Sequence, residues 1–157
     1  MKYLLDTCII SELVKPVPNA QVTNWLEGAP SNALFLSVLT IGEVRKGLVK
    51  LPDSKKKEQL TLWLNTLLEE YNERIIPIDL TVAENWGTIQ GNAEKAGTPM
   101  STIDGLISAM ASTYNLILVT RNESDFTPAQ IPLINPWKVK NLGKENKQKE
   151  EETETKC

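Results

Sequence analysis

Histidine is missing from all 157 residues of the chain. Its absence excludes Ser-His-Asp and Cys-His nucleophile systems, because each needs an imidazole to move a proton. Only two cysteines are present, Cys8 and Cys157, so a zinc site built from histidine and cysteine is excluded as well. The two cysteines lie at opposite ends of the chain and predict no disulfide framework. Chemistry in this protein must therefore use carboxylates, hydroxyls, lysine, arginine or a hard metal ion.

Long apolar runs and an excess of positive charge are missing too. No run approaches the roughly 18 apolar residues that cross a bilayer. Asp6 interrupts the apolar start too early for a signal peptide, so we expect a cytoplasmic protein. The net charge of −3 excludes a strongly basic nucleic-acid coat. It leaves room for a local basic groove.

Short apolar segments alternate with amphipathic ones along most of the chain. Apolar runs typical of strands cover residues 2–5, 34–38, 74–78, 116–120 and 131–134. Helical spacing and helix caps indicate helices over 9–14, 19–26, 41–51, 53–71, 81–96 and 103–111. This alternation predicts an α/β fold, in which helices cover both faces of a parallel sheet.

The composition changes at the end of the chain. Residues 138–157 are mostly Lys, Glu, Asn, Gln and Thr, with almost nothing to bury. Such a segment cannot offset the entropy lost on folding, so we predict a disordered charged tail. The remaining residues, 1–137, are enough for one domain and too few for two.

Four acidic residues occupy informative places in this pattern. Asp6 follows the first strand, Glu43 opens the helix after the second, Asp104 opens the helix before the fourth, and Asp125 follows the fourth. In an open α/β sheet, ligands bind in the crevice beyond the carboxyl ends of the strands. We therefore expect these four side chains to gather at that edge.

Each acid taken singly also has a structural explanation. Glu43 and Asp104 each stand three residues after a threonine or serine, which is the spacing of a capping box. Asp6 could cap the first helix, and Asp125 could stabilise a turn. Capping does not require four acids at one edge, where carboxylates about 4 Å apart repel by roughly 1 to 4 kcal/mol. A divalent cation would relieve this repulsion, and oxygen ligands favour Mg²⁺ or Mn²⁺.

Four motifs, in order along residues 1–137, resemble those of PIN-domain nucleases of the VapC type. Residues 4–7 with 10–12, LLDT and ISE, resemble the opening of these proteins, and residues 40–44, TIGEV, with Gly47 resemble their second motif. Residues 101–109, STIDGLISA, are similar to the third motif. Residues 120–126, TRNESDF, resemble the fourth, and residues 134–137, INPW, match a common ending.

The resemblance implies a PIN-like fold, with a central parallel sheet of about five strands flanked by helices. It also implies Mg²⁺-dependent, or Mn²⁺-dependent, cleavage of RNA by a toxin of a toxin–antitoxin pair. Asp6, Glu43 and Asp104 match the family's acidic core, and either Asn122 or Asp125 supplies the fourth position. We favour Asp125. A homodimer, and a cognate antitoxin that covers the acidic site, are expected as well.

Several other residues are candidates for contacts with substrate. Thr7 and Ser11 could bind ligands or phosphate, or could serve as helix caps. Arg121, with Asn122, lies beside the predicted site. Basic residues in 45–50 and 55–57 could bind RNA phosphates, although such runs are often solvated helix faces. Trp25, Trp63 and Trp86 lie in apolar helical patterns, which favours packing over base stacking.

Other functions fit less well. Haloacid-dehalogenase phosphatases need a second aspartate two residues after the first, where this chain has Cys8. A response-regulator receiver needs an acidic pair before the first helix, and Asp6 stands without such a pair. A PIN nuclease of RNA processing and an inactive PIN-fold interaction module stay open as alternatives. Metal titration would separate the inactive module from an enzyme.

Overall fold

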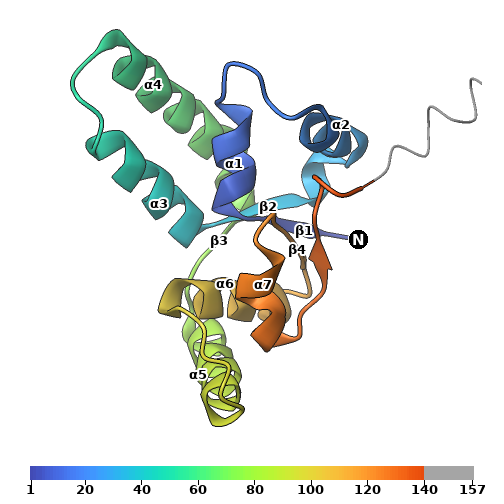
Figure 1. Ribbon diagram of the computed structural model, residues 1–157. Helices are drawn as coiled ribbons and strands as arrows, with labels where there is room; N and C mark the ends of the chain where they lie inside the picture. Colours follow the sequence, from blue (N-terminus) through green and yellow to red (C-terminus); the bar gives the residue numbers. More distant parts are fainter. Residues whose placement is uncertain (140–157) are drawn as a thin grey trace, which may run out of the picture.

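A parallel sheet forms the centre of the molecule in the computed structural model, which describes residues 1–139 (Figure 1). The strands lie in the order β3-β2-β1-β4-β5, and every neighbouring pair is parallel. Their bounds are β1 (Tyr3–Leu5), β2 (Leu34–Ser37), β3 (Ile75–Ile76), β4 (Ile117–Val119) and β5 (Leu133–Ile134). The predicted α/β class with about five parallel strands is confirmed.

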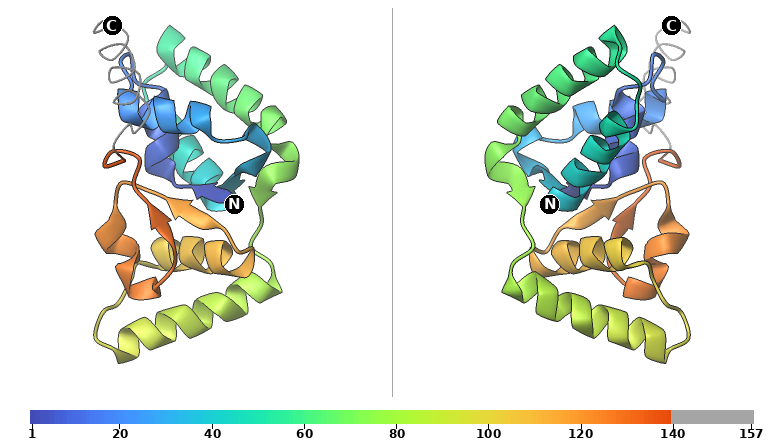
Figure 2. Two further views of the ribbon diagram at one scale, coloured as in Figure 1. Left: turned by 90° about the vertical axis from the view of Figure 1, so that its right-hand side faces the viewer. Right: turned by 90° about the vertical axis from the view of Figure 1, so that its left-hand side faces the viewer.

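Helices cover the sheet on both sides (Figures 1 and 2). One layer consists of α1 (Thr7–Leu13), α2 (Ala20–Gly28), α3 (Val38–Val49) and α4 (Lys55–Glu70). The opposite layer consists of α5 (Leu80–Lys95), α6 (Thr102–Thr113) and the short α7 (Glu123–Phe126). In the connections of the described residues lie the short 3-10 helices η1 (Ser31–Ala33), η2 (Asn72–Arg74) and η3 (Thr127–Ala129).

Alternation along the strands supplies both halves of the core. Leu4 and Leu118 belong to the apolar cluster that α5 and α6 cover. Leu5 and Val119, one residue further along each strand, belong to the cluster under α1 to α4. Successive strand residues point to opposite faces, so a sheet that is apolar at every position becomes buried on both sides.

The chain changes direction across the sheet between β1 and β4. From β1 it proceeds to β2 and β3 on one side, and only later to β4 and β5 on the other. Such a switch point leaves a crevice at the carboxyl ends of the strands. The backbone N–H of Asp6, just after β1, donates to the carbonyl oxygen of Val119 in β4 at 3.0 Å. Asp6 therefore lies at the switch point.

The predicted elements are all present, but some boundaries differ. The strand predicted over 74–78 shortens to Ile75–Ile76, because Pro77 has no N–H to donate. The helix predicted from residue 41 begins at Val38, since the Ser37 hydroxyl accepts from the Thr40 N–H at 3.0 Å and caps it there. Glu43 thus lies in the second turn. The prediction that Glu43 opens this helix in a capping box is wrong.

Two further predictions concern the chain as a whole. Within residues 1–139, no helix is long and apolar enough to cross a membrane. The predicted disordered tail, residues 138–157, lies outside the described residues from residue 140 onwards. It stays a prediction, as does the domain boundary at residue 137.

Candidate active site

Asp6 is a buried carboxylate held by neighbouring hydrogen-bond donors. Its side chain is 6% exposed. Oδ1 accepts from the backbone N–H of Thr7 at 2.8 Å, which makes Asp6 the N-cap of α1, and Oδ2 accepts from the Thr120 hydroxyl at 2.8 Å. Burial raises the pKa of Asp6, and the negative charge of Glu43 acts in the same direction. The carboxylate is therefore a helix cap whose charged form is disfavoured by burial and by Glu43.

Glu43 projects from α3 toward α1. Its carboxylate accepts a hydrogen bond from the Thr7 hydroxyl, whose oxygen also lies 3.3 Å from Thr40 Oγ1. The Ser37 hydroxyl in turn donates to Thr40 Oγ1 at 3.2 Å. A chain of hydroxyls thus joins the start of α1 to the start of α3. The sequence suggested Thr7 for contact with a ligand. In the structure, its hydroxyl group donates to Glu43 instead.

Asp104 lies in the first turn of α6, where the structure shows the Ser101 half of the predicted capping box. Ser101 is the N-cap, and its hydroxyl accepts from the Asp104 N–H at 3.1 Å and donates to Asp104 Oδ2 at 2.7 Å. Burial raises the pKa of Asp104, and the negative charges of Asp125 and Glu43 add to this effect. The charges of two other acids in the predicted set therefore act on Asp104.

These interactions join the four acids into one electrostatic group. Glu43 acts on both Asp6 and Asp104, and Asp125 acts on Asp104. The group is made of oxygen donors, as Mg²⁺ and Mn²⁺ prefer. In residues 1–139, no three Asp, Glu or Cys side chains are arranged to hold one metal ion together. The set fits the usual binding of Mg²⁺, in which one or two carboxylates act with water and substrate phosphate.

The loop after β4 carries the fourth acid. Asp125 is exposed in α7 and its charge reaches Asp104. Glu123, the other acid of this loop, is tied to Lys138 Nζ at 2.5 Å and to Asn135 Nδ2 at 3.0 Å. Asn122 precedes α7, and its backbone N–H donates to the Thr120 hydroxyl at 3.0 Å. The negative charge of Asp125 acts on Asp104, whereas Asn122 carries no charge, so the choice of Asp125 as the fourth member stays a prediction.

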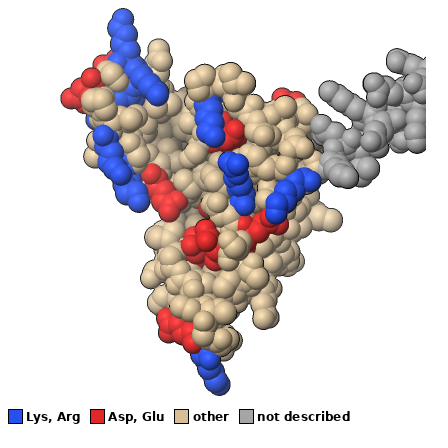
Figure 3. Space-filling model, viewed as in Figure 1, with Lys and Arg blue, Asp and Glu red and all other residues tan. Residues whose placement is uncertain are grey.

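Arg121 is a basic group beside these acids. Its guanidinium carbon lies 5.2 Å from the centre of the Trp137 ring, close enough for a cation–π interaction. A cavity of about 680 Å³ is lined by residues 121–125, Thr127 and Lys138. Figure 3, which has the same view as Figure 1, shows acidic and basic side chains close together at the centre of the face toward the reader. The basic side chains can bind a negatively charged substrate, and the acidic side chains can hold a cation beside it.

Ser11 lines a different depression, an apolar groove between α1, α3 and α4. Thr7 and Glu43 reach one end of this groove, whose volume is about 200 Å³. Its walls are apolar, formed by residues such as Val44, Leu48, Leu60 and Trp63. Trp25 and Trp63 belong to the core cluster on this side and Trp86 to the other, so the predicted packing roles are confirmed.

Thr120, Ser101 and Cys8 were not predicted as members of the site. Thr120 is fully buried against Asp6, and Cys8 Sγ lies 3.7 Å from Asp6 Oδ2. The signals in the sequence were weak: Thr120 follows a strand, Cys8 lies two residues after Asp6, and Ser101 has the spacing of a helix cap before Asp104. Position alone cannot show which carboxylate a distant hydroxyl reaches.

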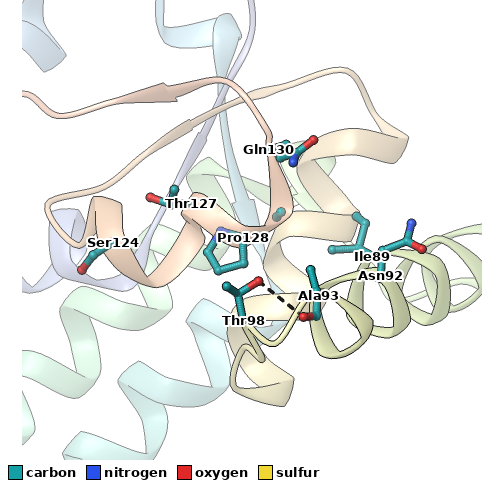
Figure 4. Close-up of a pocket in the computed structure, with 10 residues that line it drawn as sticks. Ile89, Asn92, Ala93, Thr98, Ser124, Thr127, Pro128 and Gln130 are labelled. Atoms are coloured by element: carbon teal, nitrogen blue, oxygen red, sulfur yellow. Dashed lines mark hydrogen bonds between the residues drawn. The ribbon is translucent and has the colours of Figure 1, made fainter.

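A cavity of about 630 Å³ lies between the C-terminal half of α5 and η3 (Figure 4). It is lined by small, amide and hydroxyl side chains, among them Asn92, Thr98, Ser124 and Gln130, and by no charged residue. Without a carboxylate or a cation in its lining, this cavity lacks the groups for phosphodiester cleavage. The acidic group at the switch point is the stronger candidate.

Comparison with known proteins identifies the family and the fold. Toxin FitB of Neisseria gonorrhoeae is 36% identical over 135 residues, covering 85% of this chain and 97% of FitB. VapC ribonuclease Y4jK of Sinorhizobium fredii is 33% identical over 138 residues, covering 85% of this chain and 96% of the relative. The crystal structure of FitAcB from N. gonorrhoeae superposes with a TM-score of 0.84 at 35% identity, covering 87% of this chain and 99% of that one. The PIN domain family model matches residues 3–128, and the chain therefore belongs to the PIN-domain family.

Proposed function

We propose that this protein is a Mg²⁺-dependent endoribonuclease and the toxin of a toxin–antitoxin pair. The observation that carries the proposal is the electrostatic group of Asp6, Glu43, Asp104 and Asp125 at the switch point of the sheet. Relatives that match nearly their whole length are named a toxin and a ribonuclease, which supports the same activity. We propose a cytoplasmic location, because that is where such a protein would meet its RNA substrate.

In this proposal Asp6 and Asp104 hold the metal ion, with Mn²⁺ as a substitute for Mg²⁺. When bound, the ion would lower the pKa of a water molecule and polarise the scissile phosphate. Thr120 and the N–H of Thr7 orient Asp6, and Ser101 orients Asp104. These donors keep the carboxylates aimed into the crevice before substrate arrives.

Glu43 and Asp125 complete the acidic group. Their role is to orient the attacking water or to hold a second ion. Arg121 contacts RNA phosphate, steadied by Trp137, and Asn122 lies at the same cavity. Charge-assisted contacts of arginine with phosphate are short and directional, so this side chain would set the position of the strand.

The proposed partners are RNA, a cognate antitoxin and a second copy of the chain. The antitoxin would cover the acidic site and so block cleavage. The apolar groove beside Glu43 offers places for apolar side chains of such a segment. A toxin needs this partner, whereas a PIN nuclease of RNA processing does not. A reading frame for a small DNA-binding protein next to the gene would support the toxin.

Substitution of Asp104 tests the proposal, because its capping and chemical roles separate. Asn at this third position of the capping box should cost at most about 1 kcal/mol of stability. It brings no negative charge to a hard cation, so cleavage of a structured RNA should fall at least 100-fold. Asp6→Asn should behave similarly in the cleavage assay. If Asp104→Asn cleaves at close to the wild-type rate, Asp104 is only a cap and the proposed mechanism is wrong.

A further inference from the structure

A buried amide joins α5 to the segment just before α6. Gln90 is 9% exposed, and its neighbours Ile89 and Ala93 belong to the apolar cluster on that side of the sheet. Its Nε2 donates to the carbonyl oxygen of Met100 at 2.8 Å. An amide buried among apolar groups is unfavourable unless it is hydrogen-bonded, so this bond holds Met100 against α5.

Met100 stands immediately before the residues that orient Asp104. Ser101 follows it and caps α6, and the Ser101 hydroxyl bonds both the N–H and the carboxylate of Asp104. A change in the position of the Met100 carbonyl would therefore move the cap, and the cap would move the carboxylate. The path from Gln90 to Asp104 consists of one hydrogen bond to Met100, one peptide link to Ser101, and the bonds of the Ser101 hydroxyl to Asp104.

The other side of the same amide fits against Gly105, the residue after Asp104. A Cβ at Gly105 would lie 2.4 Å from Gln90 Oε1 and 3.0 Å from Trp86 Nε1. Any larger residue at this position would have to displace one of these groups. In the described part of the chain, Gln90 Oε1 and Trp86 Nε1 are buried without a hydrogen-bond partner. Two polar atoms thus remain in the core beside the first turn of α6.

We propose that Gln90 is a positioning residue for Asp104. It sets where the first turn of α6 stands, and so where the Asp104 carboxylate meets the divalent cation. The inference rests on the proposed function, since it concerns how Asp104 serves a metal ion. A residue that only packed the core would alter stability without altering metal affinity.

Gln90→Met tests the proposal, because methionine is nearly the same length and cannot donate to Met100. Asn85→Leu is the matched control. Asn85 also lies on α5, and its Nδ2 donates to Thr113 Oγ1 at 2.9 Å, at the end of α6 far from Asp104. Mn²⁺ binding would be measured by calorimetry on the full chain without RNA, at a temperature where each variant is folded. Cleavage rates at several Mn²⁺ concentrations would accompany it.

Partners that orient a metal ligand typically change metal affinity by about 10–100-fold when they are removed. We expect Gln90→Met to weaken Mn²⁺ binding by about tenfold or more, and Asn85→Leu by less than about twofold. Excess Mn²⁺ should recover part of the lost cleavage in Gln90→Met. Gly105→Ala, which disturbs the same junction from α6, should weaken binding too and serves if Gln90→Met does not fold.

The outcomes separate the two proposals. If the wild type binds Mn²⁺, Asp104→Asn does not, and Gln90→Met binds like the wild type, the positioning role is wrong while the proposed function stands. Equal losses of affinity in Gln90→Met and Asn85→Leu would also overturn it, because they would show a general effect of α5 packing. If the wild type binds no Mn²⁺, both proposals fall.

Discussion

Single hydroxyls hold the carboxylates of the acidic group in place. The hydroxyls of Thr7, Ser101 and Thr120 donate to the carboxylates of Glu43, Asp104 and Asp6, respectively. Neutral donors stabilise a carboxylate without cancelling its charge, so its negative charge remains available to a cation. Glu123, by contrast, forms an ion pair with the ammonium group of Lys138 at 2.5 Å.

Thr120→Val tests this role of hydroxyls. The substitution keeps the shape but leaves Asp6 Oδ2 without its Thr120 donor, and hydrogen bonds to charged groups contribute about 1.5–3 kcal/mol. We expect a loss of stability in that range in the absence of metal, and at least a tenfold slower cleavage. Urea unfolding and a cleavage assay would measure the two effects.

Thr61→Val provides the control for Thr120→Val. The Thr61 hydroxyl donates to the Lys57 carbonyl oxygen within α4, at 2.8 Å and away from the acids. Its loss should leave cleavage unchanged. Equal cleavage by Thr120→Val and Thr61→Val would show that Thr120 only packs the core.

At the scale of elements, α1 depends on a second buried acid that the site does not use. This acid is Glu12, which lies near the end of α1 and is 5% exposed. It accepts from Lys15 Nζ at 2.6 Å and from the Asn19 N–H at 2.9 Å. The hydrogen bond from Lys15, followed by that from Asn19, lowers the pKa of Glu12 below its usual range. Glu12 thereby links the end of α1 to the start of α2.

Glu12→Gln should therefore have a pH-dependent effect on stability. A carboxyl group whose pKa is lowered by folding stabilises the protein above its unfolded pKa, and this contribution disappears as the pH falls through the folded pKa. The ordinary value is 4.5, so the effect should be full at neutral pH and fade below that value. Melting temperatures of wild type and Glu12→Gln at pH 7 and pH 3.5 would measure it. A constant or growing difference at low pH would contradict this assignment.

At the scale of the whole molecule, metal should stabilise the fold. A ligand that binds the native state alone adds about 2.7 kcal/mol at 100 times its Kd. We expect Mg²⁺ or Mn²⁺ at millimolar concentration to raise the melting temperature by several degrees over EDTA. Asp6→Asn combined with Asp104→Asn should lose this shift. No difference for the wild type, together with no metal binding in calorimetry, would rule out a shared site.

The quaternary state follows from the proposed toxin function. We expect a homodimer, because the resemblance to VapC-type nucleases implies one. Exposed apolar side chains such as Val49, Leu62, Ile78 and Leu80 are compatible with a surface that another chain covers. Light scattering at micromolar concentration would measure the mass. A protein that remains monomeric across this range would contradict the dimer.

The sequence alone determined the class of fold and the class of chemistry. Residues 3–5, 34–37 and 117–119 are short apolar runs, which is a pattern that the local sequence shows directly. Such runs are typical of parallel strands, because helices cover both faces of a parallel sheet. The absence of histidine left carboxylates as the main candidates, and the order of strands and helices indicated their common edge. Asp6 also proved to be the N-cap of α1, and Asp104 bonds the N-cap Ser101, so the structural and chemical explanations were not exclusive.

Tertiary structure decided what local pattern could not. Ser37 and Thr40 both had the chemistry to cap α3, and only the end of β2 selected Ser37 and moved Glu43 into the second turn. Thr120 meets Asp6 across 114 residues of sequence, and Glu123 pairs with Lys138 across 15. These pairings depend on which strands lie side by side. A local pattern sets the residue types and their spacing, but packing sets which distant groups come within hydrogen-bonding distance.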